Sequence, residues 1–427
     1  MGLFGKKKNA INYEMAPLGY WEEESYMIAI PKELSRDVLA KAVERMSAID
    51  GVIVKEFGQK TKEEPFRFCI SYKGEDYTGG MYVGNFTLPQ MPGRQDFYFT
   101  KEEWEEMSGA QFSLTVFMKF NKDAKKSFHL HLKLMYALVP NLIGVMDESA
   151  ERMLCSRWIK MAVESNVTPG PDDMYIVHAI SDDSGEVWLH THGLLRSGIS
   201  ELEIVASDKE HFESHYNILN SMARILLDKK DEFVPRQSSK MVGVLRGQIP
   251  VVATYIPWTE GMKEYPNLKV GGPDDRKEGH NSLTSFIFLY RSESDETAQK
   301  LSKVSIYNDI LEDNPIFFFS NEETDRLRMM ARERFFVVQK AAQEGHTVLL
   351  KIGLPVDEGA EGECEHIWFE LDSVNGDSFV ATLTQDPYNV SGIKKGDKRE
   401  LTVNDVTDWM IYTSQFAVTP DKSYLLF

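Results

Sequence analysis

An alternating pattern near the end of the chain places the firmest constraint on its fold. Along residues 365–371, apolar and polar side chains alternate as they do in an extended strand with one buried face. The apolar set is Ile367, Phe369 and Leu371, and the polar set is His366, Trp368 and Glu370. Asn375-Gly376 follows and favours a type I′ hairpin turn, with residues 379–383 as the partner strand. We therefore predict a small C-terminal β-rich module of the SH3-like barrel type.

The rest of the chain mixes helix and strand signals, which predicts an α+β fold. With 427 residues, the chain is too long for one ordinary core, so we expect several domains. The predicted layout starts with N-terminal α/β layers over residues 1–235, with a further division near residue 125. A middle β-rich region over residues 236–319 follows. Residues 320–427 form a helix and the C-terminal module.

Hydrophobic periodicity predicts the individual elements. Strands are expected at residues 26–30, 52–57, 66–72, 78–83, 174–180, 186–192, 201–206, 241–245, 250–256 and 285–290, and helices at residues 33–49, 100–120, 126–138, 148–163, 208–227 and 320–343. Capping boxes at residues 100–103 and 320–323 mark two helix starts. His129 and His131 are expected on a solvated surface.

Charge and cysteine usage narrow the class of partner and the compartment. The net charge is −18, from 48 Lys plus Arg against 66 Asp plus Glu, so a phosphate backbone is repelled and nucleic acid is not expected. Three widely spaced cysteines indicate neither a disulfide framework nor a CxxC site, which favours a reducing cytoplasm. The longest uncharged apolar run, residues 134–146, is too short to cross a bilayer. We expect no membrane partner.

Parts of the last quarter resemble a known group of proteins. The matching segments are residues 365–370, 376–377, 381–383, 393–397 and 408–412. They resemble the YegJ-like bacterial domain family of unknown function. Residues 188–194 and 201–203 resemble an uncharacterised bacterial module often found ahead of it. The resemblance implies the architecture and a bacterial cytoplasmic setting, and it implies no activity and no cofactor.

Four histidines form the strongest chemical pattern. His190 and His192 are two apart on an expected strand, and His211 and His215 are four apart on an expected helix, so each pair shares one face. A strand packed beside that helix could bind a divalent metal with these four imidazoles. The alternative, which is favoured, is that His190 and His192 extend a half-exposed strand face while His211 and His215 lie on a solvated side of the helix.

A polar loop over residues 271–280 is a second candidate site. It gathers Asp274, Asp275, Arg276 and His280 between glycine-containing turns, a mixture that suits acid–base chemistry. The alternative, a hydrophilic connection whose charges pair locally, is favoured. The sequence has no nucleophile elbow, phosphate-binding loop or dinucleotide fingerprint.

An aromatic face is the third candidate. Trp368 shares the polar strand face with His366, and Tyr388, Trp409 or Tyr412 could complete a groove for an extended peptide. Equally, a second sheet or the preceding helix could cover this face.

These observations favour a non-catalytic interaction or regulatory protein with a protein partner and without a cofactor. An immunity protein that neutralises a basic toxin is one form of this hypothesis. The alternative is a metal-dependent hydrolase centred on His190, His192, His211 and His215, with a divalent metal as its cofactor.

Overall fold

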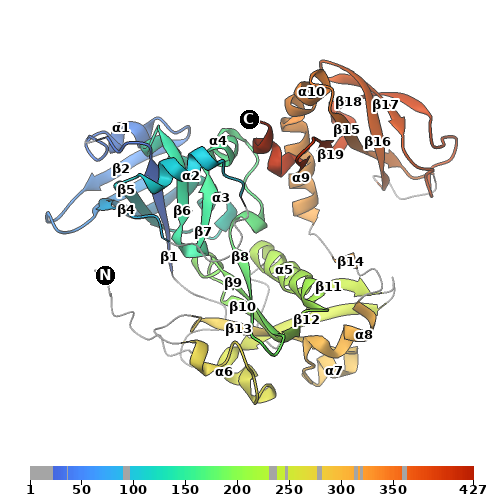
Figure 1. Cartoon of the computed structure of the whole chain (residues 1–427), viewed down its shortest axis with the longest axis horizontal. Helices are drawn as coiled ribbons and strands as arrows, with labels where there is room; N and C mark the ends of the chain where they lie inside the picture. The colour runs from blue at the N-terminus through green and yellow to red at the C-terminus, as the bar shows by residue number, and fades with distance from the viewer. Residues whose placement is uncertain are drawn as a thin grey trace. The chain divides into compact units, whose positions relative to one another are not determined.

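A computed structural model of the chain describes residues 23–35, 37–89, 97–229, 238–245, 249–276, 281–311, 316–317, 321–357 and 363–427. The chain divides into two compact units (Figure 1). The first comprises Met1–Leu154 and Pro169–Ser320, and the second comprises Cys155–Thr168 and Asn321–Phe427. Helices occur with three separate sheets, which confirms the predicted multidomain α+β class. The predicted domain limits stay predictions, and residues 235 and 319 lie outside the described residues.

The first unit opens with a seven-stranded sheet in the order β2-β3-β4-β5-β1-β6-β7. Its strands are β1 (Glu24–Pro31), β2 (Val52–Gly58), β3 (Phe66–Tyr72), β4 (Glu75–Asn85), β5 (Phe112–Lys119), β6 (Leu142–Asp147) and β7 (Arg152–Cys155). β1 lies antiparallel between β5 and β6, with Met27 and Ala29 in the core. The strands predicted in the first 90 residues are confirmed.

Among the described residues, the helices beside this sheet are α1 (Ala42–Ser47), α2 (Lys101–Ser108) and α3 (Ala124–Leu138). The capping box that starts α2 is confirmed, since Thr100 Oγ1 accepts from the Glu103 N–H and Glu103 Oε2 accepts from the Thr100 N–H. The prediction that this helix runs to residue 120 is wrong. It ends at Ser108, and β5 follows, because β5 is a run of mostly apolar and β-branched residues buried in the middle of the sheet.

The surface position predicted for His129 and His131 is also wrong. Both lie on α3 with exposed fractions of 4% and 0%, because this helix is buried around most of its circumference. The two ring nitrogens of His131 lie 3.2 Å from Ser25 Oγ and 3.2 Å from the Val116 carbonyl oxygen. His131 is therefore a hydrogen-bonded core residue.

The first unit contains a second seven-stranded sheet, in the order β14-β11-β12-β13-β10-β9-β8. Its strands are β8 (Ile176–Ser181), β9 (Glu186–His192), β10 (Glu201–Asp208), β11 (Lys240–Leu245), β12 (Ile249–Pro257), β13 (Thr284–Tyr290) and β14 (Ile316–Phe317). β8 and β9 form the predicted hairpin, and β10 and β13 pair in parallel. All six strands predicted in this region are confirmed.

Helical segments cover this second sheet on both sides (Figure 1). Its helices are α5 (Phe212–Lys229), α6 (Trp258–Gly261), α7 (Glu293–Thr297) and α8 (Asn308–Leu311). α5 contacts β10 and β11, whereas α6 and the residues after it pack on an aromatic cluster that includes Trp188, Phe286 and Phe288. The face with Trp188 carries the candidate site described below.

The second unit is built on a six-stranded sheet in the order β18-β17-β16-β15-β19-β20. Its elements are α4 (Ser156–Glu164), α9 (Asn321–Glu333), α10 (Phe335–Gln343), β15 (Thr347–Pro355), β16 (Cys364–Asn375), β17 (Ser378–Leu383), β18 (Lys398–Thr402), β19 (Val406–Tyr412) and β20 (Ala417–Val418). On β16, Ile367 and Phe369 are buried while His366 and Glu370 are exposed, which confirms the predicted alternation.

Three finer predictions for this region are wrong. The described strands form an open sheet whose edges are β18 and β20, and not a closed barrel, because α10 supplies Phe335 and Val338 to the core. The helix predicted over residues 148–163 is instead a short 3-10 turn, β7 and α4. The type I′ turn is replaced by one centred on Gly376-Asp377, since Asn375 pairs with Ser378.

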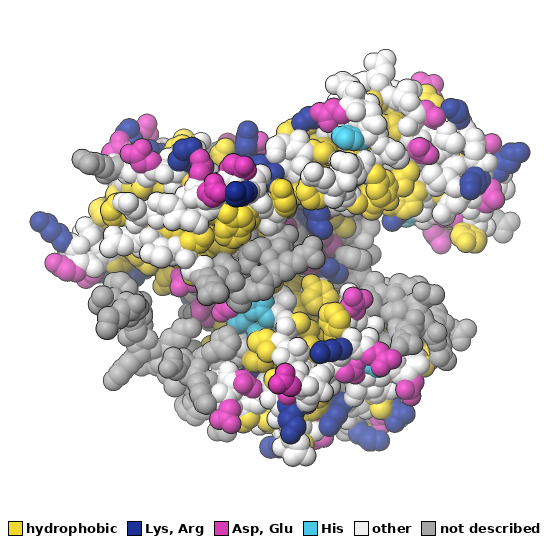
Figure 2. Space-filling model, in the orientation of Figure 1, with side chains coloured by type: hydrophobic (Ala, Val, Ile, Leu, Met, Phe, Trp, Pro, Cys, Tyr) yellow, Lys and Arg dark blue, Asp and Glu magenta, His cyan; other side chains and the backbone are white. Residues whose placement is uncertain are grey.

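Among the described residues, no helix is both long and apolar enough to cross a membrane. On the face drawn in Figure 2, acidic and basic side chains are interspersed over the described residues of each unit.

Candidate metal centre

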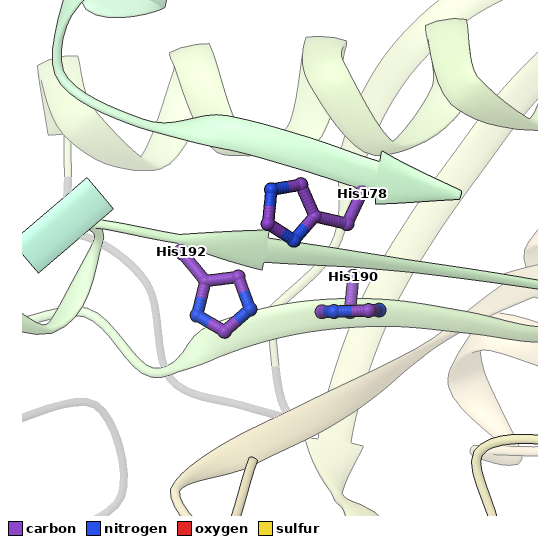
Figure 3. A group of neighbouring side chains, drawn as sticks. All are labelled: His178, His190 and His192. Atoms are coloured by element: carbon purple, nitrogen blue, oxygen red, sulfur yellow. The ribbon is translucent and has the colours of Figure 1, made fainter. Parts of the chain in front are cut away.

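Three histidines meet on one face of the second sheet, at its β8–β9 edge. The antiparallel ladder pairs His178 directly with His190. His192 lies two residues further along β9, so its side chain points to the same face as that of His190. Figure 3 shows the three rings gathered from these two adjacent strands. One hairpin therefore brings three imidazoles together.

The spacing of the three rings fits one shared metal ion. The His178 ring centroid lies 5.5 Å from that of His190 and 5.0 Å from that of His192, and the last two are 5.0 Å apart. Ring nitrogens, one from each histidine, all lie within 4.8 Å of one another. Two nitrogens on one tetrahedral zinc ion are about 3.3 Å apart, since each Zn–N bond is about 2.0–2.1 Å. Binding of one zinc ion would therefore require side-chain rotations that bring the nitrogens closer together.

The histidine cluster is largely buried. His190 and His192 have exposed fractions of 1% and 8%, and His178 is half-buried. The Trp188 ring lies 4.1 Å from the His190 ring, centroid to centroid, and its Nε1–H donates to Glu203 Oε2 at 3.1 Å. The tryptophan is thus fixed as one wall of the cluster.

A carboxylate from outside the hairpin completes the group. Glu151, in the turn between β6 and β7, places its Oε1 atom 3.6 Å from Nδ1 of His192. Glu151 is about two-fifths exposed at its side chain. Glu151 therefore supplies an acidic side chain next to this cluster.

A second carboxylate, Glu201, holds the backbone that follows His192. Its Oε1 atom accepts from the N–H groups of Gly193, Leu194 and Leu195 at 2.8, 2.8 and 3.1 Å. Its Oε2 atom accepts from Thr191 Oγ1 at 2.6 Å. Burial raises the pKa of Glu201 to about 7, against these four hydrogen bonds, which favour the charged form. Glu201 thereby fixes the end of β9.

The structure separates His211 and His215 from His190 and His192. His215 Nδ1 lies 2.7 Å from Ser207 Oγ, and its Nε2 lies 3.0 Å from Asn308 Oδ1. His211 Nδ1 lies 2.8 Å from Asp208 Oδ1. Burial lowers the pKa of His215. These two histidines belong to a polar cluster that joins α5 to α8, and His178 takes their place beside His190 and His192.

His178 lies on the strand predicted over residues 174–180, but it is not among the predicted site residues. Its neighbour depends on the hairpin register, which strand periodicity alone does not fix. The structure pairs Ser181 with Val187 and therefore His178 with His190, so that both side chains lie on the same face.

The described residues of the predicted polar loop do not lie together in one site. Arg276 is buried and forms an ion pair with Glu203, at 2.6 Å between Nη2 and Oε2. Asp274 and Asp275 are exposed, and Asp275 Oδ2 accepts from the N–H of Gly272. His280 lies outside the described residues.

The tryptophans of the predicted aromatic face lie on opposite faces of the sheet. Trp409 is fully buried in the core, with its Nε1–H bonded to a backbone carbonyl of α9. Trp368 is half-buried and His366 exposed on the opposite face. Tyr388 and Tyr412 have exposed fractions of 88% and 45%.

Comparison with known families places these features in named domains. Residues 25–169 match the model described as "Protein of unknown function (DUF4026) N-terminal", and residues 177–288 match its C-terminal counterpart. Residues 325–419 match "Uncharacterized protein conserved in bacteria (DUF2314)". The matched segments are therefore similar, in chain order, to the DUF4026 N-terminal domain, the DUF4026 C-terminal domain and DUF2314. No curated protein and no solved structure matches the chain.

The DUF4026 C-terminal domain contains all three clustered histidines, whereas Glu151 belongs to the DUF4026 N-terminal domain. The resemblance predicted for the last quarter is confirmed as a bacterial family of unknown function, which is DUF2314. Its finer assignment as YegJ-like stays a prediction.

Proposed function

We propose that this DUF4026 protein is a regulatory protein that binds one divalent transition metal ion through His178, His190 and His192. The observation that carries the proposal is the convergence of three imidazoles, whose nitrogens lie within 4.8 Å of one another. Imidazole suits zinc, copper and nickel, whereas magnesium and calcium prefer oxygen ligands. Zinc is therefore the first ion to test.

Burial favours a binding role over catalytic turnover. His190 and His192 are almost completely enclosed by protein. A catalytic ion needs a coordination position that substrate can reach, whereas a closed site mainly stabilises the folded state. A protein whose stability depends on an ion is suited to respond to the supply of that ion.

Metal analysis of the whole chain, purified without tag or chelator, tests this proposal. We expect about one equivalent of zinc, copper or nickel, lost in His178→Ala and His190→Ala. His346→Ala is the matched control, since His346 lies in the other unit and outside the cluster. His215→Ala tests the four-histidine prediction separately. Wild-type protein that retains no metal after zinc incubation and dialysis would sink the proposal.

A metal-dependent hydrolase is the second candidate, and one observation favours it. Three protein ligands leave a fourth tetrahedral position for water, as in catalytic zinc sites. His178 is half-buried, so this ligand is the one nearest to solvent. Zinc-loaded protein should then hydrolyse simple carboxylic or phosphate ester probes, and His178→Ala should not. No turnover by the zinc-loaded wild type would exclude this activity for the probes used.

The interaction role is proposed for the DUF2314 sheet. Trp368 is half-buried on the face opposite the core, and Lys351 Nζ lies 5.4 Å from its ring centroid. A partly exposed tryptophan beside a cation is a suitable anchor for a protein partner, including the toxin of the immunity-type hypothesis. A partner recovered with the wild type and lost with Trp368→Ala would support this role. Equal recovery with both proteins would count against it.

We also propose a cytoplasmic location. Cys69, Cys155 and Cys364 are free thiols, which suit a reducing compartment. Cell fractionation tests this, and recovery in an exported fraction would contradict it.

A further inference from the structure

We propose that Glu151 is a positioning residue for His192, so that the DUF4026 N-terminal domain sets the metal affinity of the C-terminal domain. This inference rests on the proposed function, because it concerns the same three-histidine site. It adds a residue from a different domain and a mechanism by which the two domains respond to metal together.

The first observation concerns the two nitrogens of His192. Nδ1 faces Glu151, at 3.6 Å from Oε1. Nε2 is buried, and Figure 3 shows the His192 ring with an edge toward His190. A carboxylate next to Nδ1 favours the tautomer with its proton on that atom, which leaves the Nε2 lone pair for a metal ion. Metal-bound histidines commonly use such a carboxylate partner.

The second observation is that the backbone presents Glu151 in an unusual conformation. Its φ is +51°, in the left-handed region that non-glycine residues rarely adopt. Its N–H donates to the Glu148 carbonyl, which closes the turn after β6. A strained residue is retained where the surrounding structure fixes it, and here the turn directs the side chain toward β9.

The third observation is the close packing of the two chain segments. Gly193 directly follows His192, and a Cβ atom there would lie 3.1 Å from Cβ of Ala150, the residue before Glu151. With any other residue at this position, Ala150 would have to shift by a few tenths of an ångström. The turn after β6 and the end of β9 are thus in direct contact.

The fourth observation is a buried ion pair that locks the same two segments. Arg196 Nη1 and Nη2 donate to the two carboxylate oxygens of Asp147 at 2.7 and 2.8 Å, with no solvent exposure of either side chain. Asp147 precedes Glu151 by four residues, and Arg196 follows His192 by four residues. This bidentate pair therefore ties the end of β6 to the segment that follows β9.

The consequence is a linkage between metal binding and domain contact. If docking of the N-terminal domain raises metal affinity through Glu151, then metal must strengthen that docking by the same factor. Loss of the ion loosens the contact between residues 148–152 and β9. A change in metal supply is thereby converted into a change in the DUF4026 domain pair.

The experiment compares four whole-chain proteins by zinc competition with a chromophoric chelator. The proteins are the wild type, Glu151→Asn, Glu151→Gln and Glu148→Gln. Asparagine tolerates positive φ but is too short to reach His192, so we expect a loss of affinity of about 10- to 100-fold. Glutamine keeps the length and an oxygen acceptor and should restore most of the affinity. Glu148 is exposed and three residues away, so Glu148→Gln should match the wild type.

Two further measurements separate a positioning role from other roles. The visible spectrum of the cobalt-substituted protein should keep its band pattern in Glu151→Asn, since the three nitrogen ligands remain. Zinc should slow amide hydrogen exchange in residues 148–152 of the wild type and not of Glu151→Asn. A changed cobalt spectrum would make Glu151 a direct ligand and overturn the positioning role.

The outcomes distinguish this inference from the proposed function. If the wild type binds zinc and the zinc affinity of Glu151→Asn lies within about threefold of the wild-type value, the inference is overturned. The proposed metal site itself is not contradicted by that result. Wild-type protein that binds no metal overturns both.

Discussion

Arg276 and Glu203 form a bidentate ion pair inside the DUF4026 C-terminal domain, with Nη1–Oε1 and Nη2–Oε2 distances of 2.8 and 2.6 Å. Their side chains have exposed fractions of 2% and 0%. The Arg276 guanidinium also lies 4.4 Å from the Trp258 ring centroid. The pair therefore fixes the segment that begins at Trp258 onto the sheet face that carries the three histidines.

Arg276→Met should destabilise the protein by about 3–5 kcal/mol, because it leaves the Glu203 carboxylate buried without its cation. Adding Glu203→Gln should recover at least half of this loss, since glutamine is neutral and can still accept from Trp188. Urea unfolding of the wild type, both single variants and the double variant measures the coupling. Additive effects of the two substitutions would contradict the pairing.

The face of each strand in the last module could be predicted from sequence, but the residues that cover each face could not. Alternation correctly assigned Ile367 and Phe369 to the core. It did not show that Trp409 lies in that same core, because a tryptophan in a short strand fits either face. The pattern also could not show that α10 covers the sheet, and this cover accounts for the open sheet in place of the predicted barrel.

Only two of the four residues discussed for the candidate site could be predicted from the sequence. His190 and His192 were recognised because strand periodicity places them on one face without knowledge of any partner. His178 depends on the hairpin register, where an error of one residue reverses the face. Glu151 depends on contacts between two domains, and no local pattern encodes those. Contacts between residues that are far apart in the sequence are therefore the part of the site that local sequence patterns do not predict.

His131 should make the protein less stable in acid. Burial, together with the Arg196 charge, lowers the pKa of His131 from 6.5 to about 3. Between pH 6.5 and pH 3, His131 binds a proton in the unfolded chain but not in the folded chain. The contribution of neutral His131 to the free energy of unfolding is therefore fully present above pH 6.5 and decreases as the pH falls toward 3. From pH 7.5 to pH 5 the loss from this one group is about 2 kcal/mol.

Urea unfolding of the wild type and His131→Gln at both pH values checks this expectation. Glutamine does not titrate and can still hydrogen-bond, so the variant should lose about 2 kcal/mol less than the wild type over this interval. Equal losses in the two proteins would show that His131 is not a source of the acid sensitivity.

Substitution by alanine should reduce the stability of the protein more at Gly193 than at Gly185, although both glycines have positive φ. Their φ values are +115° and +85°, so alanine is strained at either position, by about 1–2 kcal/mol. At Gly185 an added Cβ meets no atom within 4 Å. At Gly193 it would lie 2.5 Å from the Met174 carbonyl oxygen, which must move. Overpacking of this kind costs about 1–3 kcal/mol more.

Unfolding free energies and zinc affinities of Gly193→Ala and Gly185→Ala separate strain from clash. Gly185→Ala should lose about 1–2 kcal/mol of stability and keep the zinc affinity of the wild type. Gly193→Ala should lose more stability, and its zinc affinity should also fall, because the clash displaces the backbone next to His192 and with it the approach to Glu151. Similar values for the two variants would mean that the close contact at Gly193 does not constrain the site.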